Sequence, residues 1–307
     1  MIKIFKNVFR AAVFPFILVY KIIIFPYRVI KGFLLFLNTE PEDHPLSETV
    51  VRLTTDAEAR QAFWLQVEDL RFHLLRILIG IAIAVSASFY FTISLMDYLA
   101  KPIGGLTQLQ AIEVTEEIGV YMRVALTSGI TLALPYIVFE VWYFVATGLR
   151  AREKKLSLLA IPLATLLFVG GVVFTHRILI PAALPFLGGF TQIAQFWTAK
   201  EYFGFITGLM LWIGLFFEFP LAVFVLAYLG IIEPKVLLQQ WRLAIVVIAL
   251  LAAAVTPTVD PVNMSLVMLP MVLLYFVGLL LSYIAVAVRR RRNLETENSK
   301  EQEQVPP

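Results

Sequence analysis

The sequence predicts an all-α membrane protein with six transmembrane helices and both termini in the cytoplasm. Three observations lead to this fold class. Of the 307 residues, 60% are hydrophobic and 15% are charged, and the mean hydropathy is +0.83. Charge-free apolar runs recur along the chain, and lysine and arginine are concentrated in alternate connections between them. A soluble chain of this length would carry more charge and fewer uninterrupted apolar stretches.

Six charge-poor runs are candidate spans, at residues 77–96, 124–149, 156–174, 202–232, 243–257 and 264–288. The fifth is short, because about 15 residues of helix extend only ~22 Å, less than a hydrocarbon core of ~30 Å. A helix of this length thins the bilayer or needs neighbouring helices. We therefore expect the end of the protein formed by the last two helices to contact other subunits.

The distribution of basic residues predicts the orientation. Lysine and arginine follow the second, fourth and sixth spans, at Arg150, Arg152, Lys154, Lys155, Lys235, Arg242 and residues 289–292. The remaining connections between spans are poor in basic residues. Because positive residues favour the cytoplasmic side, both termini are expected there.

Composition divides the chain into four parts. Residues 1–38 carry a narrow basic stripe on an apolar body, which predicts a helix lying in the headgroup layer of the cytoplasmic leaflet. A seventh span or a re-entrant hairpin is the alternative. Residues 39–61 are expected to form a cytoplasmic linker, residues 62–288 the six-helix membrane domain, and residues 289–307 a basic, then polar and disordered tail.

Two carboxylates fall inside the predicted spans. Glu218 lies near mid-depth, where a charge costs about 2.5–3.5 kcal/mol and normally faces a partner or a polar cavity. It is either a protonated, hydrogen-bonded structural group or a functional one, and Pro220 should loosen the helix beside it. Glu140 is nearer the cytoplasmic end of its span and is expected to extend toward the interface.

Several kinds of chemistry are excluded or disfavoured. The chain has no cysteine, which removes disulfides and thiolate sites. Its three histidines, His44, His73 and His176, are far apart in sequence and lie outside the predicted spans, so no metal site or cofactor is expected. No Gly-x-x-x-x-Gly-Lys-Ser/Thr pattern is present, and neither nucleotide-driven catalysis nor a nucleic-acid partner is expected.

A series of short motifs carries a family resemblance. They are Val67-Glu68-Asp69-Leu70-Arg71, Leu99-Ala100-Lys101-Pro102-Ile103, Val114-Thr115-Glu116, Phe139-Glu140-Val141-Trp142-Tyr143-Phe144, Gly148 to Lys155, Phe217-Glu218-Phe219-Pro220 and Thr256-Pro257-Thr258-Val259-Asp260-Pro261. In this order and spacing they make residues 62–288 similar to the TatC family, the large membrane subunit of the twin-arginine protein translocase. The resemblance implies a concave bundle in the cytoplasmic membrane whose last two helices are short.

The resemblance also implies where signal peptides bind. Glu153 and Asp69 match the family's two signal-contacting acids, with Glu68 as a second candidate beside Asp69 and Arg71. Phe144 matches an aromatic residue that contacts the apolar part of the peptide. Without the resemblance, each residue has a simpler interpretation. Glu153 would be a solvated loop acid, Asp69 and Arg71 would be a pair that stabilises the start of a helix, and Phe144 would be a packing residue.

Further matches concern the partners. The resemblance places Glu218 and Glu140 among intramembrane polar groups that meet partner subunits. It assigns Thr256, Pro257 and Asp260 to the partner-binding end, and Pro102, Thr115 and Glu116 to an outer cap; ordinary turn chemistry explains these residues equally well.

The function implied is a receptor without chemistry of its own. It would bind twin-arginine signal peptides of folded proteins and assemble in several copies with single-span subunits of the TatA and TatB kind, using the proton-motive force. A secondary transporter with Glu218 as its coupling carboxylate is the alternative, but no internal repeat supports it. An intramembrane enzyme would need paired acids at one depth, and Glu140 and Glu218 are expected at different depths.

Overall fold

The computed structural model describes residues 31, 34–38, 57–147, 149, 154–155, 157–188, 196–256 and 261–303. The described elements are α3 (Ala57–Ser88), α4 (Thr92–Ala100), η1 (Lys101–Ile103), η2 (Leu106–Gln108), β1 (Leu109–Gln110), α5 (Glu116–Ala146), α7 (Ala160–Phe174), η3 (Thr175–Leu179), α8 (Ile180–Gly188), β2 (Trp197–Thr198), α9 (Ala199–Phe217), α10 (Phe219–Leu229), α11 (Pro234–Gln239), α12 (Trp241–Val255) and α13 (Pro261–Glu303).

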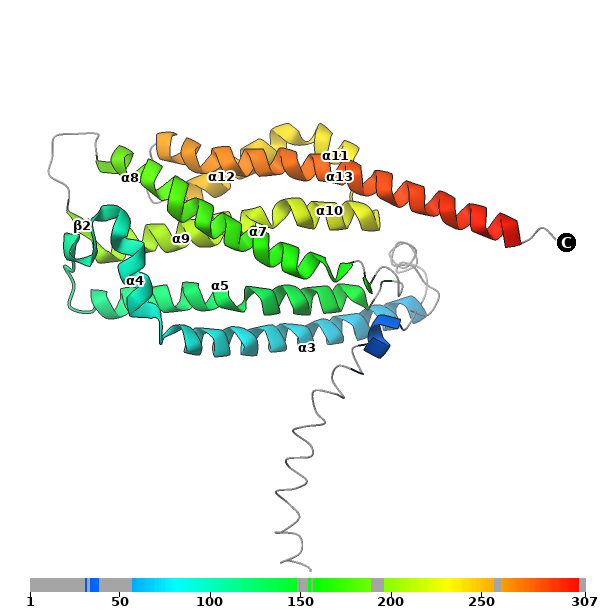
Figure 1. Ribbon diagram of the computed structural model, residues 1–307, viewed down its shortest axis with the longest axis horizontal. Helices are drawn as coiled ribbons and strands as arrows, with labels where there is room; N and C mark the ends of the chain where they lie inside the picture. Colours follow the sequence, from blue (N-terminus) through cyan, green and yellow to red (C-terminus); the bar gives the residue numbers. More distant parts are fainter. Residues whose placement is uncertain are drawn as a thin grey trace, which may run out of the picture.

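The long helices lie side by side with their axes roughly aligned (Figure 1). α3 packs along α5, α9 packs against both α5 and α7, and α13 packs against α10 and α12. α7, the π-turn η3 and α8 form one continuous helical rod, whereas α9 and α10 are separated by a break at Glu218. The result is an all-α bundle.

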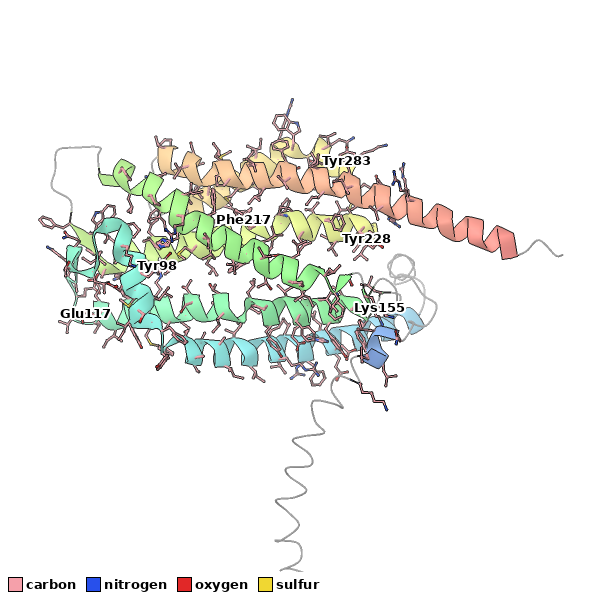
Figure 2. The ribbon with its side chains drawn as sticks, viewed as in Figure 1. Tyr98, Glu117, Lys155, Phe217, Tyr228 and Tyr283 are labelled. Carbon is pink, nitrogen blue, oxygen red and sulfur yellow. The ribbon has the colours of Figure 1, made fainter. Side chains whose placement is uncertain are left out.

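The two ends of the bundle differ in content. At one end, here called the connection end, α3 begins, α5 ends, α7 begins and the C-terminal part of α13 extends beyond the bundle (Figure 1). The other, the cap end, holds α4 and a two-stranded parallel sheet in which Leu109 pairs with Trp197 and Gln110 with Thr198. Lys155 and Glu117 mark these two ends in Figure 2.

The predicted number of spans is confirmed. Five helical segments are long and apolar enough to cross a membrane: Glu68–Ser88, Glu116–Ala146, Ala160–Pro185, Ala199–Leu229 and Pro261–Arg291. Trp241–Val255 is a sixth, shorter apolar helix, as expected for the fifth span. The expectation that the last helix is also short is wrong, because no charged residue interrupts its 31-residue span before Arg289.

The chain after the last span also differs from expectation. α13 continues as helix to Glu303, in place of the disordered tail predicted after Arg292. Leu, Glu, Lys and Gln dominate this stretch, and all four are good helix formers. Low hydrophobicity therefore did not prevent helix formation here.

The main core lies in the half of the bundle nearer the cap end. α9 supplies its largest buried side chains, among them Tyr202, Phe203 and Ile206, which pack against residues from α4, α5 and α8. α7 and α9 approach closely at Gly171 and Gly214, since a Cβ on Gly171 would lie 2.9 Å from the Cα of Gly214. Small residues permit this kind of close helix contact in a membrane protein.

Candidate functional site

A polar cluster links α3 and α5 in the half of the bundle toward the connection end. His73 Nδ1 donates to Glu140 Oε2 at 2.6 Å, and the Tyr136 hydroxyl donates to Glu140 Oε1 at 2.9 Å. Arg76 lies 4.0 Å from the same carboxylate. Both His73 and Glu140 are buried. These bonds compensate for burying polar groups among apolar helices and fix α3 against α5.

This cluster overturns two sequence-based expectations. Glu140 does not extend to the interface but is held inward by His73 and Tyr136. His73 and His176 do not lie outside the spans, because α3 begins before its charge-free run and α7 continues through η3. An intramembrane acid signals a need for a partner, but nothing in the sequence selects a histidine 67 residues away.

Exposed charged residues stand one helical turn from this cluster, toward the connection end. Glu68, Asp69 and Arg71 are all exposed on α3, and none of them forms an ion pair with another described residue. Asp69 and His73 share a face of the helix by their spacing. The half-buried Phe144 ring meets the His73 ring edge-on, with centroids 5.9 Å apart. The structure thus brings Asp69 and Phe144 to the same corner of the bundle.

A short N-terminal segment, residues 34–38, packs on the neighbouring face of α5. Leu37 is buried in a cluster with Trp142, and the Phe36 ring stacks on Tyr143 with centroids 4.6 Å apart. Lys154 is buried beneath this segment, its Nζ 4.3 Å from the Phe36 ring centre and donating to the Phe36 carbonyl at 3.4 Å. Burial lowers the pKa of the Lys154 ammonium. Sequence analysis did not anticipate this contact.

Glu218 occupies the break between α9 and α10. It is half-buried, and its Oε1 is buried without a hydrogen-bond partner in the described part of the chain. Pro220 lies in the first turn of α10 and cannot donate a backbone hydrogen bond, which accounts for the interruption. The predicted loosening beside Glu218 is confirmed.

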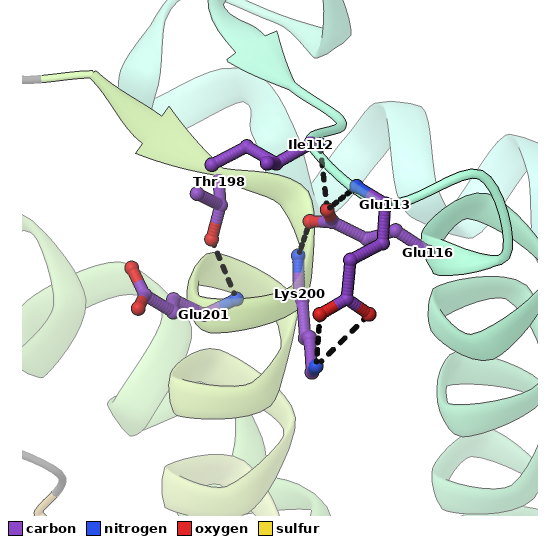
Figure 3. Close-up of polar contacts among 6 residues, drawn as sticks. All are labelled: Ile112, Glu113, Glu116, Thr198, Lys200 and Glu201. Carbon is purple, nitrogen blue, oxygen red and sulfur yellow. Dashed lines mark hydrogen bonds and ion pairs between the residues drawn. The ribbon is translucent and has the colours of Figure 1, made fainter.

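At the cap end, Glu116 joins two parts of the chain that are remote in sequence. Its Oε2 accepts from the backbone N–H groups of Ile112 and Glu113, at 2.8 and 3.3 Å, and its Oε1 accepts from the N–H of Lys200 at 2.7 Å (Figure 3). The Lys200 ammonium in turn pairs with Glu113 at 3.3 Å. Glu116 therefore holds the start of α5 to the start of α9, in agreement with a cap.

The other predicted cap residues are less engaged. Thr115 stands at the N-cap position of α5 without a capping side-chain bond, and Pro102 lies in the first turn of η1. The α9 cap is made instead by Thr198, whose hydroxyl accepts from the N–H of Glu201 at 3.2 Å (Figure 3).

The partner-binding end is described only in part. Thr256 is buried, and its hydroxyl donates to the Ala252 carbonyl at 2.8 Å, which closes the last turn of α12. Pro257, Asp260 and Glu153 lie outside the described residues, as do residues 1–30 of the predicted interfacial helix and residues 39–56 of the predicted linker.

Residues 66–270 match the model of the family described as Sec-independent protein translocase protein (TatC). This chain belongs to the TatC family. The matched region contains the α3–α5 cluster, the Glu218 break and the Glu116 cap.

Individual TatC relatives agree over most of the chain. The Sec-independent protein translocase protein TatC of Deinococcus radiodurans is 32% identical over 249 residues, which cover 78% of this chain and 92% of that protein. TatCy of Bacillus subtilis is 31% identical over 224 residues, covering 71% and 87%. A crystal structure of the twin arginine translocase receptor TatC matches with a TM-score of 0.66 and 29% identity, covering 72% of this chain and 99% of that one.

These matches establish the class of protein. The chain is a multi-pass membrane protein and a subunit of the Sec-independent translocase, not an enzyme. The alternative of a secondary transporter rested on Glu218 alone and finds no support in the family.

Proposed function

We propose that this TatC-family chain is the receptor subunit that binds twin-arginine signal peptides of folded proteins at its cytoplasmic face. The observation that carries the proposal is the pair of exposed carboxylates, Glu68 and Asp69, which lie about one helical turn before His73, whose ring contacts the half-buried Phe144 ring. Guanidinium groups pair bidentately with carboxylates. Phe144 offers apolar surface to the hydrophobic part of a peptide whose arginines meet these acids.

Glu153 is the third acid of the proposed site. It directly precedes Lys154, which is anchored beneath Phe36 at the connection end. Glu153 is included on its position in the sequence next to Lys154 and on the family resemblance. Arg71, two residues after Asp69 on α3, is the remaining charged residue of the proposed site.

The proposed orientation follows from charge. Basic residues predominate at the connection end, at Lys154, Lys155, Lys235 and residues 289–291, whereas the cap end balances Lys101, Arg177 and Lys200 with Glu113, Glu116 and Glu117. The positive-inside rule therefore places the connection end, with the signal-peptide site and both termini, in the cytoplasm.

The test is direct binding of a twin-arginine signal peptide to the full-length chain in lipid nanodiscs, with a twin-lysine peptide as the control ligand. Glu153→Lys is expected to abolish binding, and Asp69→Asn to weaken it about tenfold, since each charge-assisted bond is worth about 1.5–3 kcal/mol. Glu201→Gln, an acid at the cap end, is the matched control. Wild-type binding in both Glu153→Lys and Asp69→Asn would refute the site.

We further propose that single-span partner subunits contact the membrane face near Glu218 and the Thr256 end. A transmembrane partner can supply the polar group that the buried Glu218 oxygen lacks. Glu218→Ala is expected to reduce co-purification of the partner subunits while twin-arginine peptide affinity is retained. Unchanged complexes and unchanged protein export in that variant would return Glu218 to a structural role.

A further inference from the structure

A hollow at the cap end separates the η1 turn from the π-turn η3. Its volume is about 660 Å³, and its lining includes Tyr98, Lys101, His176 and Arg177. No acidic side chain is found among the described residues that line it. Neither the family match nor the proposed signal-peptide site, at the opposite end of the bundle, gives this hollow a role.

The hollow lies near a membrane interface. His176 follows the start of α7 at Ala160 by roughly 24 Å of helix. A hydrocarbon core is about 30 Å thick, so a helix that enters at the connection end brings His176 to within about 6 Å of the opposite headgroup layer. Tyr98, labelled in Figure 2, lies at the cap end, where α4 and the α7–α8 rod come together. Phospholipid phosphate groups lie just beyond this depth, within reach of long Arg and Lys side chains.

The imidazole of His176 is an unsatisfied buried group. Its residue is only 8% exposed, and Nδ1 has no hydrogen-bond partner within the described residues. The ring lines the hollow and meets the Tyr98 ring edge-on, with centroids 4.6 Å apart. A half-turn about the Cβ–Cγ bond exchanges its two edges, so either nitrogen can be presented. Buried polar atoms normally have a partner, and an external ligand can supply one.

The backbone at this point is also unusual. Residues Thr175–Leu179 form a π-turn inside an otherwise α-helical rod. Such a turn inserts an extra residue and rotates the side chains that follow, and π-turns are frequent at functional sites. Here it places His176 and Arg177 next to each other at the wall of the hollow.

Lys101 and Arg177 are exposed cations without an acidic partner in the described part of the chain. Lys101 Nζ lies 5.3 Å from the centre of the Tyr98 ring, so Tyr98 is flanked by Lys101 and His176. Other cations at the cap end are engaged: Lys200 pairs with Glu113, and Arg123 donates to the Gly204 carbonyl at 3.4 Å. The positive charge of the hollow is therefore left uncompensated.

We propose that this hollow binds a phosphate group through Lys101, His176 and Arg177. The Arg177 guanidinium can hold two phosphate oxygens at once, Lys101 adds a point charge, and His176 donates from its ring N–H. The same chemistry would recognise the phosphodiester of a phospholipid headgroup or free inorganic phosphate. The depth of the hollow favours the headgroup.

The test uses the purified full-length chain in dodecyl maltoside. Dihexanoyl-phosphatidylglycerol below its micellar concentration and inorganic phosphate are titrated separately, with chloride at equal ionic strength as a blank. Native mass spectrometry counts the bound lipid, and thermal unfolding reports ligand stabilisation. The double variant Lys101→Gln, Arg177→Gln is expected to weaken binding about tenfold. His176→Phe, which keeps a ring against Tyr98, should weaken it several-fold.

Arg123→Gln and Lys200→Gln are the matched controls, because they remove cations from the same end outside this hollow. Saturable binding of the lipid alone assigns the site to a headgroup, and binding of both ligands assigns it to a general phosphate site. Absence of binding to the wild type, or equal weakening by the controls, overturns the proposal. Because Lys101 and Arg177 are exposed, the double variant is expected to fold. It therefore still tests the proposal if His176→Phe does not fold.

Discussion

Two acidic residues at the cap end, Glu113 and Glu116, and two at the connection end, Glu68 and Asp69, differ in their bonding. At the cap end, Glu116 accepts three backbone N–H groups and Glu113 pairs with Lys200. At the connection end, Glu68 and Asp69 are exposed and make no ion pair with another described residue. Acids that are already bonded hold structure together, whereas acids without partners are available to a ligand.

The buried residues next to the two ends also differ. The exposed acids Glu68 and Asp69 lie about one helical turn from the buried His73–Glu140 hydrogen bond, which fixes this part of α3 against α5. The cap end rests on the main core, dominated by α9. We therefore expect substitutions at the cap end to change stability, and substitutions of the exposed acids at the connection end to change binding alone.

The largest effect on stability is expected from Glu116→Ala. This change removes the acceptor of three backbone N–H groups and the link between α5 and α9, so Tm in detergent should fall by several degrees. Glu117→Ala, an exposed acid one residue away, is the matched control and should leave Tm almost unchanged. Equal Tm values for the two variants would show that the cap bonds contribute nothing.

The second effect concerns the buried hydrogen bond between His73 and Glu140. A double-mutant cycle of His73→Phe and Glu140→Leu is expected to give a coupling energy of about 1–2 kcal/mol, measured by unfolding in mixed micelles. The double variant should be more stable than the sum of the single changes predicts, because neither His73 nor Glu140 is then left without the other as its partner. Strict additivity would mean that the 2.6 Å contact is energetically neutral.

The spans could be predicted from sequence, but their ends could not. The charge-free run at 77–96 crosses a turn after Ser88, where α3 stops. That turn is held by bonds invisible to hydropathy: the Ser88 hydroxyl donates to the Ala125 carbonyl, and the Tyr121 hydroxyl to the Phe89 carbonyl. At its other end, α3 continues through Glu68, Asp69 and Arg71, because exposed charges do not stop a helix.

The residues of the candidate site were found in part. Motifs located Asp69, Phe144, Glu116 and Glu218, since each falls in a recognisable order along the chain. The partners of these residues were not found, because packing selects them: His73 for Glu140, and Lys200 for Glu116. The π-turn at His176 has no local sequence signal that we recognise.

A third prediction tests the docked segment at the connection end. Leu37→Ala removes a buried side chain, whereas Leu34→Ala removes an exposed one from the same segment. Losing three buried carbon atoms corresponds to roughly 2 kcal/mol, so the undocked population should rise more than tenfold in Leu37→Ala alone. Trypsin cleavage at Lys31 and Lys154 measures this opening. Equal cleavage of both variants would contradict the contact.

The smallest effect is expected at Thr256, where a hydroxyl closes its own helix. Thr256→Val keeps the shape of the side chain and removes only the bond to the Ala252 carbonyl. Intrahelical bonds of this kind in membranes contribute about 0.5 kcal/mol, so Tm should change little. A large loss of partner-subunit binding with unchanged Tm would instead show that the hydroxyl is shared with a partner. Thr256 would then resemble the available acids of the connection end more than the bonded acids of the cap.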